Sequence, residues 1–214
     1  MAQIRQDITP HDRIETKIVR ITGECSLEYY VSRNAHLTLV LLLHAAKELQ
    51  ADVCVRMAEV GSQADIVGFI VGTSESRYVL NTQQLHESAE TRSNLLVRSV
   101  LYGSDAFFYR GSIRVDVGAQ KTDAYQRNEN LLLSPNAHTE SKPMLEILAN
   151  DVRCTHGATV SSIPKEELWY LESRGIPKHS GKKLITDGFL ERSLALISDT
   201  IARQEVRKWL HKAM

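Results

Sequence analysis

The sequence predicts a mainly β body followed by a small helical region at the C-terminus. Short apolar segments of roughly four to eight residues recur about every ten to fourteen residues up to Ser162. The clearest segment, 106–117, places Ile113, Val115 and Val117 on one face, with charged residues between them. After Ser162 the apolar spacing changes to one that is typical of helices.

The strand pattern alone leaves three β architectures open: a sandwich, a barrel and a solenoid. No crisp repeat is present, and the spacing gives only an irregular period of roughly 20 to 25 residues per solenoid coil. Few Asn-Gly or Asp-Gly pairs occur, which mildly disfavours tight antiparallel hairpins.

Composition excludes several classes of function. The 26 basic and 26 acidic residues cancel and form no long run of one sign, so we expect no nucleic-acid partner. The apolar stretch 37–46 is too short to span a membrane, and residues 1–12 contain no apolar segment of a secretion signal. The three cysteines are widely spaced, which favours reduced thiols and a cytoplasmic location over a disulfide framework.

A first C-terminal helix is expected near Pro164, because proline is favoured in a first helical turn. Ser161 or Ser162 is the predicted N-cap, and Gly175 is expected to end the helix.

A second helix is expected from about Ser180 to Leu190. Residues 193–212 are only partly periodic and end in a basic segment. We therefore divide the chain into a β core, 1–162, and a helical region, 163–214.

Cys154 and His156 are the first candidates for chemistry. Residues two apart on a strand share one face, so a thiol and an imidazole would point the same way, and both groups can bind a soft or borderline metal. The alternative is a half-buried cysteine beside a polar histidine at a strand end. His138 is a weaker candidate, because a surface histidine in a loop explains it as well.

A charged ladder follows in sequence: Lys121, Asp123, Arg127 and Glu129. These residues either line a tunnel between strands or form a solvated strand face. The sequence has no GxxxxGK[ST], GxSxG, HExxH or GxGxxG motif, so we expect this chain to bind no nucleotide itself.

Three segments carry a resemblance to a known family: GAQKTDAYQRNENLLLSP, SKPMLEILANDVRCTHGATVS and EELWYLESRGIP. In this order and spacing, the chain resembles the core domain of the SufB/SufD family, scaffold subunits of the SUF iron–sulfur cluster assembly machinery, and is closer to SufD. The resemblance implies a right-handed parallel β-helix. It also implies a cytoplasmic, non-enzymatic scaffold without the family's usual N-terminal helical domain.

The resemblance gives His156 a role at the interface between two scaffold subunits, where a transient iron–sulfur cluster forms, and places Cys154 in the same motif. Two positions depart from SufB-type chains. Gly157 stands where those chains carry a glutamate, and Pro135-Asn136-Ala137-His138 lacks their cysteine. A complete cluster site within one subunit is therefore not expected.

Two partners follow from the resemblance. A second SufB/SufD-type subunit, identical or different, would cover an exposed coil near residues 145–160, and a SufC-type ABC ATPase would bind the C-terminal helices. The residues expected to contact the ATPase are Trp169, Tyr170, Arg174, Leu184, Ile185 and Phe189. The competing class is a β-solenoid enzyme acting on polysaccharide or acyl groups, which would share only the architecture.

Overall fold

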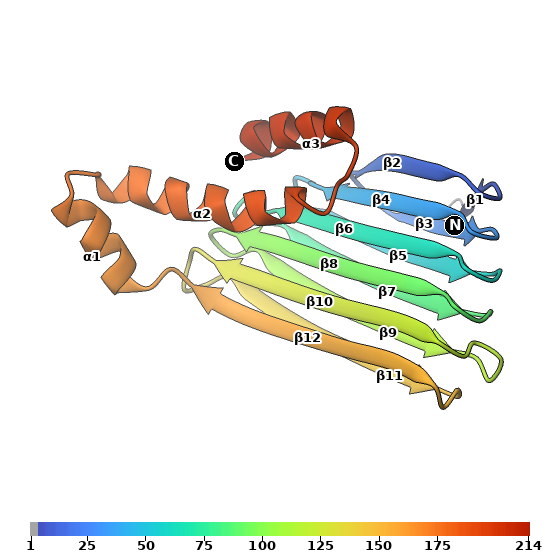
Figure 1. Ribbon diagram of the computed structural model, residues 1–214. Coiled ribbons are helices and arrows are strands. Elements are labelled where there is room, and N and C mark those ends of the chain that lie inside the picture. Colours follow the sequence, from blue (N-terminus) through green and yellow to red (C-terminus); the bar gives the residue numbers. More distant parts are fainter. Residues whose placement is uncertain (1–3) are drawn as a thin grey trace.

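The computed structural model describes residues 4–214, which form twelve strands and three helices (Figure 1). The strands are β1 Ile4–Thr9, β2 Ile14–Ile21, β3 Cys25–Val31, β4 His36–Leu43, β5 Glu48–Met57, β6 Gln63–Val71, β7 Arg77–His86, β8 Arg92–Leu101, β9 Ala106–Val115, β10 Thr122–Leu132, β11 His138–Ile147 and β12 Val152–Ser162. The helices are α1 Lys165–Ser173, α2 Lys178–Leu194 and α3 Thr200–Ala213.

Odd and even strands form two separate parallel sheets, in the orders β1-β3-β5-β7-β9-β11 and β12-β10-β8-β6-β4-β2. The chain alternates between the two sheets, so each pair of consecutive strands adds one coil to a solenoid. This confirms the predicted mainly β, parallel β-helix fold with a helical region at its C-terminal side.

Most coils are longer than the predicted 20 to 25 residues. Ile14 of β2 pairs with His36 of β4, 22 residues later, but Ala106 of β9 pairs with His138 of β11, 32 residues later. The predicted period was therefore wrong for most of the solenoid, because the strands lengthen from six residues in β1 to eleven in β12.

The main core lies between the two sheets. Each strand turns alternate residues inward, and partners in adjacent parallel strands share the same face. β4 is buried along almost its whole length, because its other face is covered as well. The inward residues Leu37, Leu39 and Leu41 are fully buried in this main core.

A second apolar core joins the helices to the outer face of the even-numbered sheet. Val40, Val67 and Phe69 from the strands pack with residues such as Leu190 of α2 and Val206 of α3. Helices α2 and α3 are thus part of the folded body, and their removal would expose this face of the sheet.

The helix boundaries differ in part from those expected. The N-cap of α1 is Pro164 and makes no side-chain cap hydrogen bond, while Ser161 and Ser162 belong to β12, so the predicted serine cap was wrong. Gly175 follows α1 with a φ of +82°, a conformation that suits glycine. Helix α3 is capped by Asp199, whose carboxylate accepts hydrogen bonds from the backbone N–H groups of residues 201 and 202.

Candidate assembly surface at the terminal coil

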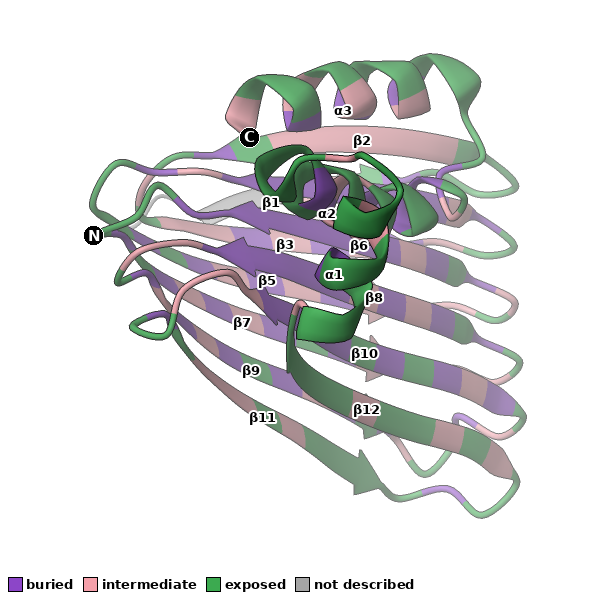
Figure 2. Ribbon diagram, turned by 90° about the vertical axis from the view of Figure 1, so that its left-hand side faces the viewer, coloured by how far each residue is buried: buried purple, intermediate pink, exposed green. Residues whose placement is uncertain are grey.

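Strands β11 and β12 form the last coil of the solenoid, which we call the terminal coil. Each is an edge strand of its sheet, with a neighbour on one side only. Both strands consist entirely of exposed and half-buried residues, whereas β9, beside β11, has every second residue buried and β10, beside β12, is largely buried (Figure 2). The backbone groups along these two edges are therefore open to pairing with another chain.

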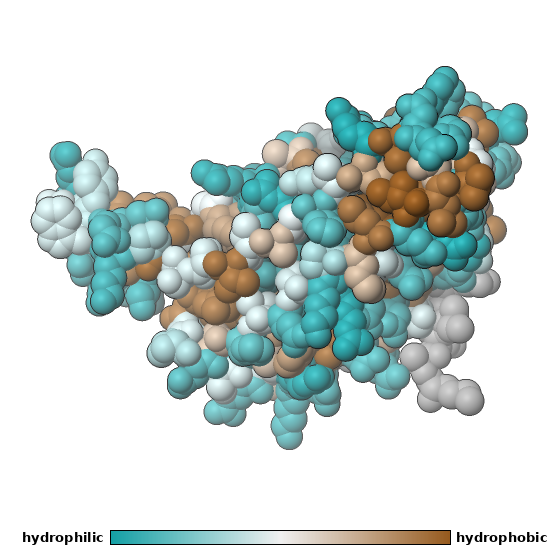
Figure 3. Space-filling model, turned by 90° about the horizontal axis from the view of Figure 1, so that it is seen from below, coloured by the Kyte–Doolittle hydropathy of each residue, from teal (hydrophilic) through white to brown (hydrophobic). Residues whose placement is uncertain are grey.

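The inner face of the terminal coil exposes large apolar side chains. Leu145 pairs with Ile113, and Val160 pairs with Asn130; both partners point into the solenoid. Leu145 is nevertheless 37% exposed and Val160 is 54% exposed. Seen from this end, the surface carries a broad apolar patch (Figure 3). The exposed large apolar residues of this coil are Leu145, Ile147 and Val160 on the inner face, Leu148 in the turn after β11 and Met144 on the outer face of β11.

The opposite end of the solenoid carries inward-pointing charges. Lys17 of β2 pairs with the inward-facing Leu39, so its ammonium group points into the first coil. There it contacts Asp7 at 2.7 Å and Glu15 at 3.3 Å. Charges that point inward are a known protection of sheet edges against association. The inward positions of the terminal coil, from Thr139 to Ile147 and from Val152 to Val160, contain no Lys, Arg, Asp or Glu.

Cys154 and His156 lie on the inner face of β12. Cys154 pairs with Ala124 and His156 pairs with Gln126, and both partners are buried inside the solenoid. His156 is exposed, while Cys154 is half-buried against the last apolar cluster. The structure therefore brings both side chains to the open end of the solenoid, on one face of its edge strand. Residues 4–214 contain no group of three or more His, Cys, Asp and Glu side chains that could hold a metal.

Burial raises the pKa of the Cys154 thiol, and the nearby carboxylate of Asp123 adds to this effect. Burial also raises the pKa of Cys25, and it raises that of Cys54 to about 11. All three cysteines are free thiols. In the isolated chain these thiols are protonated at neutral pH, so metal binding by Cys154 would require loss of its proton.

The two departures from SufB-type chains lie on or beside the terminal coil. Gly157 sits on the outer face of β12, and a Cβ there would stand 4.0 Å from Cγ of Arg127. His138 begins β11 on the outer face of the other sheet, where its ring lies 5.8 Å from that of Phe108. His138 and His156 thus face away from one another, and the structure does not bring His138 into a site with Cys154.

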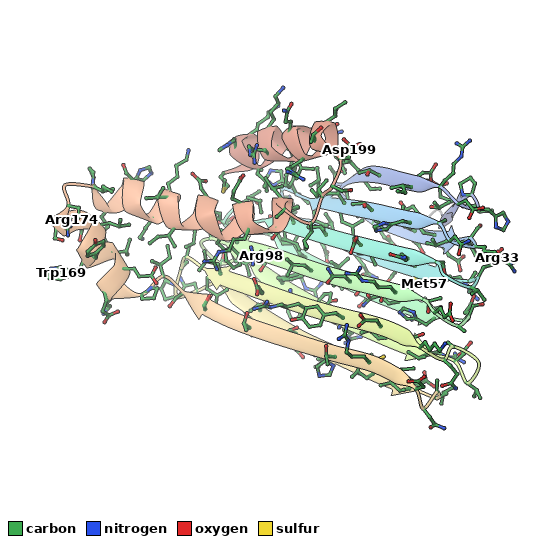
Figure 4. The ribbon with its side chains drawn as sticks, viewed as in Figure 1. Arg33, Met57, Arg98, Trp169, Arg174 and Asp199 are labelled. Atoms are coloured by element: carbon green, nitrogen blue, oxygen red, sulfur yellow. The ribbon has the colours of Figure 1, made fainter. Side chains whose placement is uncertain are left out.

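Helix α1 and residues 178–188 of α2 form a helical arm that extends beyond the sheets (Figure 1). Trp169, Tyr170 and Leu184 are 70%, 55% and 54% exposed. Arg174 lies over the ring of Tyr170, 5.3 Å from its centroid, at the far end of the arm (Figure 4). The arm therefore presents a set of large side chains that the body leaves uncovered.

The remaining two predicted contact residues are placed differently. Ile185 is half-buried. Phe189 packs into the second core, and the centroid of its ring lies 4.8 Å from the guanidinium carbon of Arg98.

No helix in the described part of the chain is long and apolar enough to cross a membrane.

This arrangement defines a class of protein: a parallel β-solenoid with one charged end, one open apolar end that carries a thiol and an imidazole, and an exposed helical arm. Comparison with known proteins identifies the family. The model of the SufBD core domain, described as SUF system FeS cluster assembly, matches residues 14–189. The chain therefore belongs to the SufBD core domain family, as the sequence motifs predicted.

Curated relatives agree with this assignment and favour the SufD side of the family. The chain is similar to the iron–sulfur cluster assembly protein SufD of Escherichia coli (strain K12), with 35% identity over 56% of this chain and 29% of that protein. It is also similar to SufD of Bacillus subtilis (strain 168), with 32% identity over 61% of this chain and 30% of that protein.

A longer alignment is found with an iron–sulfur cluster assembly SufBD family protein of Mycobacterium tuberculosis (strain ATCC 25618 / H37Rv). The two are 28% identical over 86% of this chain and 47% of that protein. The alignments thus span less than half the length of these curated relatives. The matched family is one of iron–sulfur cluster assembly, whereas the alternative of a polysaccharide or acyl-group enzyme rested on architecture alone.

Proposed function

We propose that this chain is a scaffold subunit of SUF iron–sulfur cluster assembly that acts without enzymatic turnover of its own. The nascent cluster is its cargo, held transiently between the terminal coil and a second SufB/SufD-type subunit. The observation that supports this most directly is the position of Cys154 and His156, which share the inner face of an uncovered edge strand.

One chain offers only these two neighbouring ligands at the terminal coil. A cluster needs more, and zinc or iron sites built from thiolate and imidazole usually have four protein ligands. The further ligands would come from the facing subunit, either a second copy or a SufB-type chain. The apolar inner face beside them would then be covered by the same contact, and water would be excluded from the cluster.

The second proposed partner is a SufC-type ATPase, which would bind the helical arm. Exposed aromatic side chains are the usual anchors of such contacts. Trp169, Tyr170 and Leu184 supply them here, with Arg174 beside Tyr170. Phe189 is assigned instead to the attachment of α2 to the body, because it packs against the sheet.

The test is anaerobic reconstitution with ferrous iron and sulfide, alone and with a SufB-type subunit, followed by visible absorption. We expect Cys154→Ser and His156→Ala to reduce the cluster absorption of the assembled pair by more than half. The matched controls are Cys54→Ser, a half-buried thiol on another coil, and His11→Ala, a histidine in the turn between β1 and β2 whose side chain is 62% exposed. Loss of absorption in the controls, or none in the test variants, would remove Cys154 and His156 from the proposed site.

A further inference from the structure

The helical arm overhangs the body and is attached to it at two places. Its first attachment is the chain itself, because Ile163 and Pro164 connect β12 directly to α1. Between the arm and the body lies a groove of about 450 Å³, lined by Leu168 and Lys182 on one side and Pro135 on the other. Open space thus separates this part of the arm from the sheets.

The second attachment is a buried arginine. Arg98 projects from the outer face of β8 toward α2 and is only 6% exposed (Figure 4). Its Nη1 donates a hydrogen bond to the backbone carbonyl of Phe189, and its guanidinium lies over the Phe189 ring. This contact meets α2 where the helix leaves the overhanging arm and reaches the sheet.

The same arginine is bound to the neighbouring strand. Its Nε donates to Oε2 of Glu129 on β10 at 2.6 Å, and Glu129 is itself only 6% exposed. Oε1 of Glu129 forms an ion pair with Arg127, whose Nε lies 2.6 Å away. Glu129 and Arg127 pair in register with Thr159 and Gly157 of β12. An unbroken series of contacts therefore runs from α2 across two strands to the edge strand that carries His156.

A buried ion pair of this kind is weak evidence for a stabilising role. Two well-packed apolar residues often stabilise such a position equally well, whereas removal of one partner leaves a buried charge without compensation. A charged pair does fix the relative position of the groups that it joins, because its geometry is strict. The series also ties the sheet-bound end of α2 to the strand that faces the proposed scaffold partner.

We propose that Arg98 and Glu129 form a joint that transmits displacement of the helical arm to β12. Movement of the arm about the contact between Arg98 and Phe189 would shift the middle of β12. This inference rests on the proposed function, in which one partner binds the arm and another covers the terminal coil. Arg98 and Glu129 would then be positioning residues that couple the two contacts.

The experiment measures amide hydrogen exchange in residues 155–160 of the chain alone, so its outcome does not depend on either partner. The helix is loosened with Leu190→Ala, in the wild-type background and in the background Arg98→Met/Glu129→Leu, which replaces the ion pair by apolar side chains. Val206→Ala, which creates a cavity in the same apolar core but on α3, is the matched control. Two protein concentrations tenfold apart reveal any protection that comes from self-association.

We expect Leu190→Ala to accelerate exchange in residues 155–160 roughly three- to tenfold in the wild-type background, as for coupled neighbouring sites. In the background without the ion pair the same change should alter exchange less than twofold, and Val206→Ala should have little effect in either. Equal acceleration in both backgrounds, no acceleration in the wild type, or the same effect from Val206→Ala would each overturn the proposal. If the double variant does not fold, Arg98→Met alone, which leaves Glu129 paired with Arg127, replaces it with the same expected outcomes.

Discussion

A charge placed on the inner face of the terminal coil should abolish assembly while leaving the fold intact. Val160→Lys makes this change, because Val160 points toward the solenoid axis beside Asn130. It places an inward-pointing lysine at the open end, as Lys17 does at the opposite end. In the free chain Val160 is 54% exposed, so the lysine can extend into water and the free energy of unfolding should change by only about 0.5 kcal/mol.

In the assembled state the same ammonium group would be buried without a counter-ion. The cost of burying an unpaired charge is several kcal/mol after relaxation. A cost of about 3 kcal/mol corresponds to an affinity lowered roughly 100-fold. Val60→Lys is the matched control, because Val60 is 42% exposed in a loop on an earlier coil and should leave association unchanged.

Sedimentation velocity measures association, for the chain alone and for its mixture with a SufB-type subunit. Urea unfolding of the same variants measures the stability of the free chain. If Val160→Lys associates as tightly as the wild type, the inner face of the terminal coil is not the contact surface. If instead it unfolds the chain, the assumption that Val160 is free to reorient is wrong.

Two further predictions concern the core and the arm. Burial lowers the pKa of His86 from 6.5 to about 4, so the neutral ring stabilises the fold fully above pH 6.5 and this contribution is lost as the pH falls to about 4. Between pH 6.5 and pH 4, the free energy of unfolding measured in urea should therefore fall by about 3 kcal/mol more for the wild type than for His86→Gln. An equal fall in both proteins would contradict this. Trp169→Ala and Leu184→Ala should each weaken binding of a SufC-type ATPase in calorimetry by about 2 kcal/mol, roughly 30-fold. The control Ile201→Ala, 77% exposed on α3, should bind normally, and an equal loss there would place the contact elsewhere.

Much of the fold could be predicted from local pattern. The alternation around Ile113 and Val115 predicted β9, because a strand with one buried face has a period of two. The length of a coil could not be predicted in this way, since it depends on which residues of distant strands pair. Asp199 carried a signal that sequence reasoning missed: an aspartate before an amphipathic segment is a common N-cap, and α3 begins directly after it.

For the candidate site, the sequence predicted how residues on one strand lie relative to one another, but not how that strand pairs with others. The spacing of Cys154 and His156 placed both on one face, but only their pairing with Ala124 and Gln126 shows that this is the inner face of the terminal coil. Glu129 belonged to a charged ladder that a solvated strand face could explain, yet it is buried against Arg98. Its partner lies 31 residues away, and nothing in the local sequence gives that register.

The central claim is that the terminal coil, and not the opposite end, is the assembly surface. Amide hydrogen exchange of the chain mixed with a SufB-type subunit tests this most directly. We expect slower exchange in residues 138–147 and 152–162 on complex formation, with residues 4–21 unchanged. Protection of residues 4–21 with unchanged exchange in β11 and β12 would contradict it.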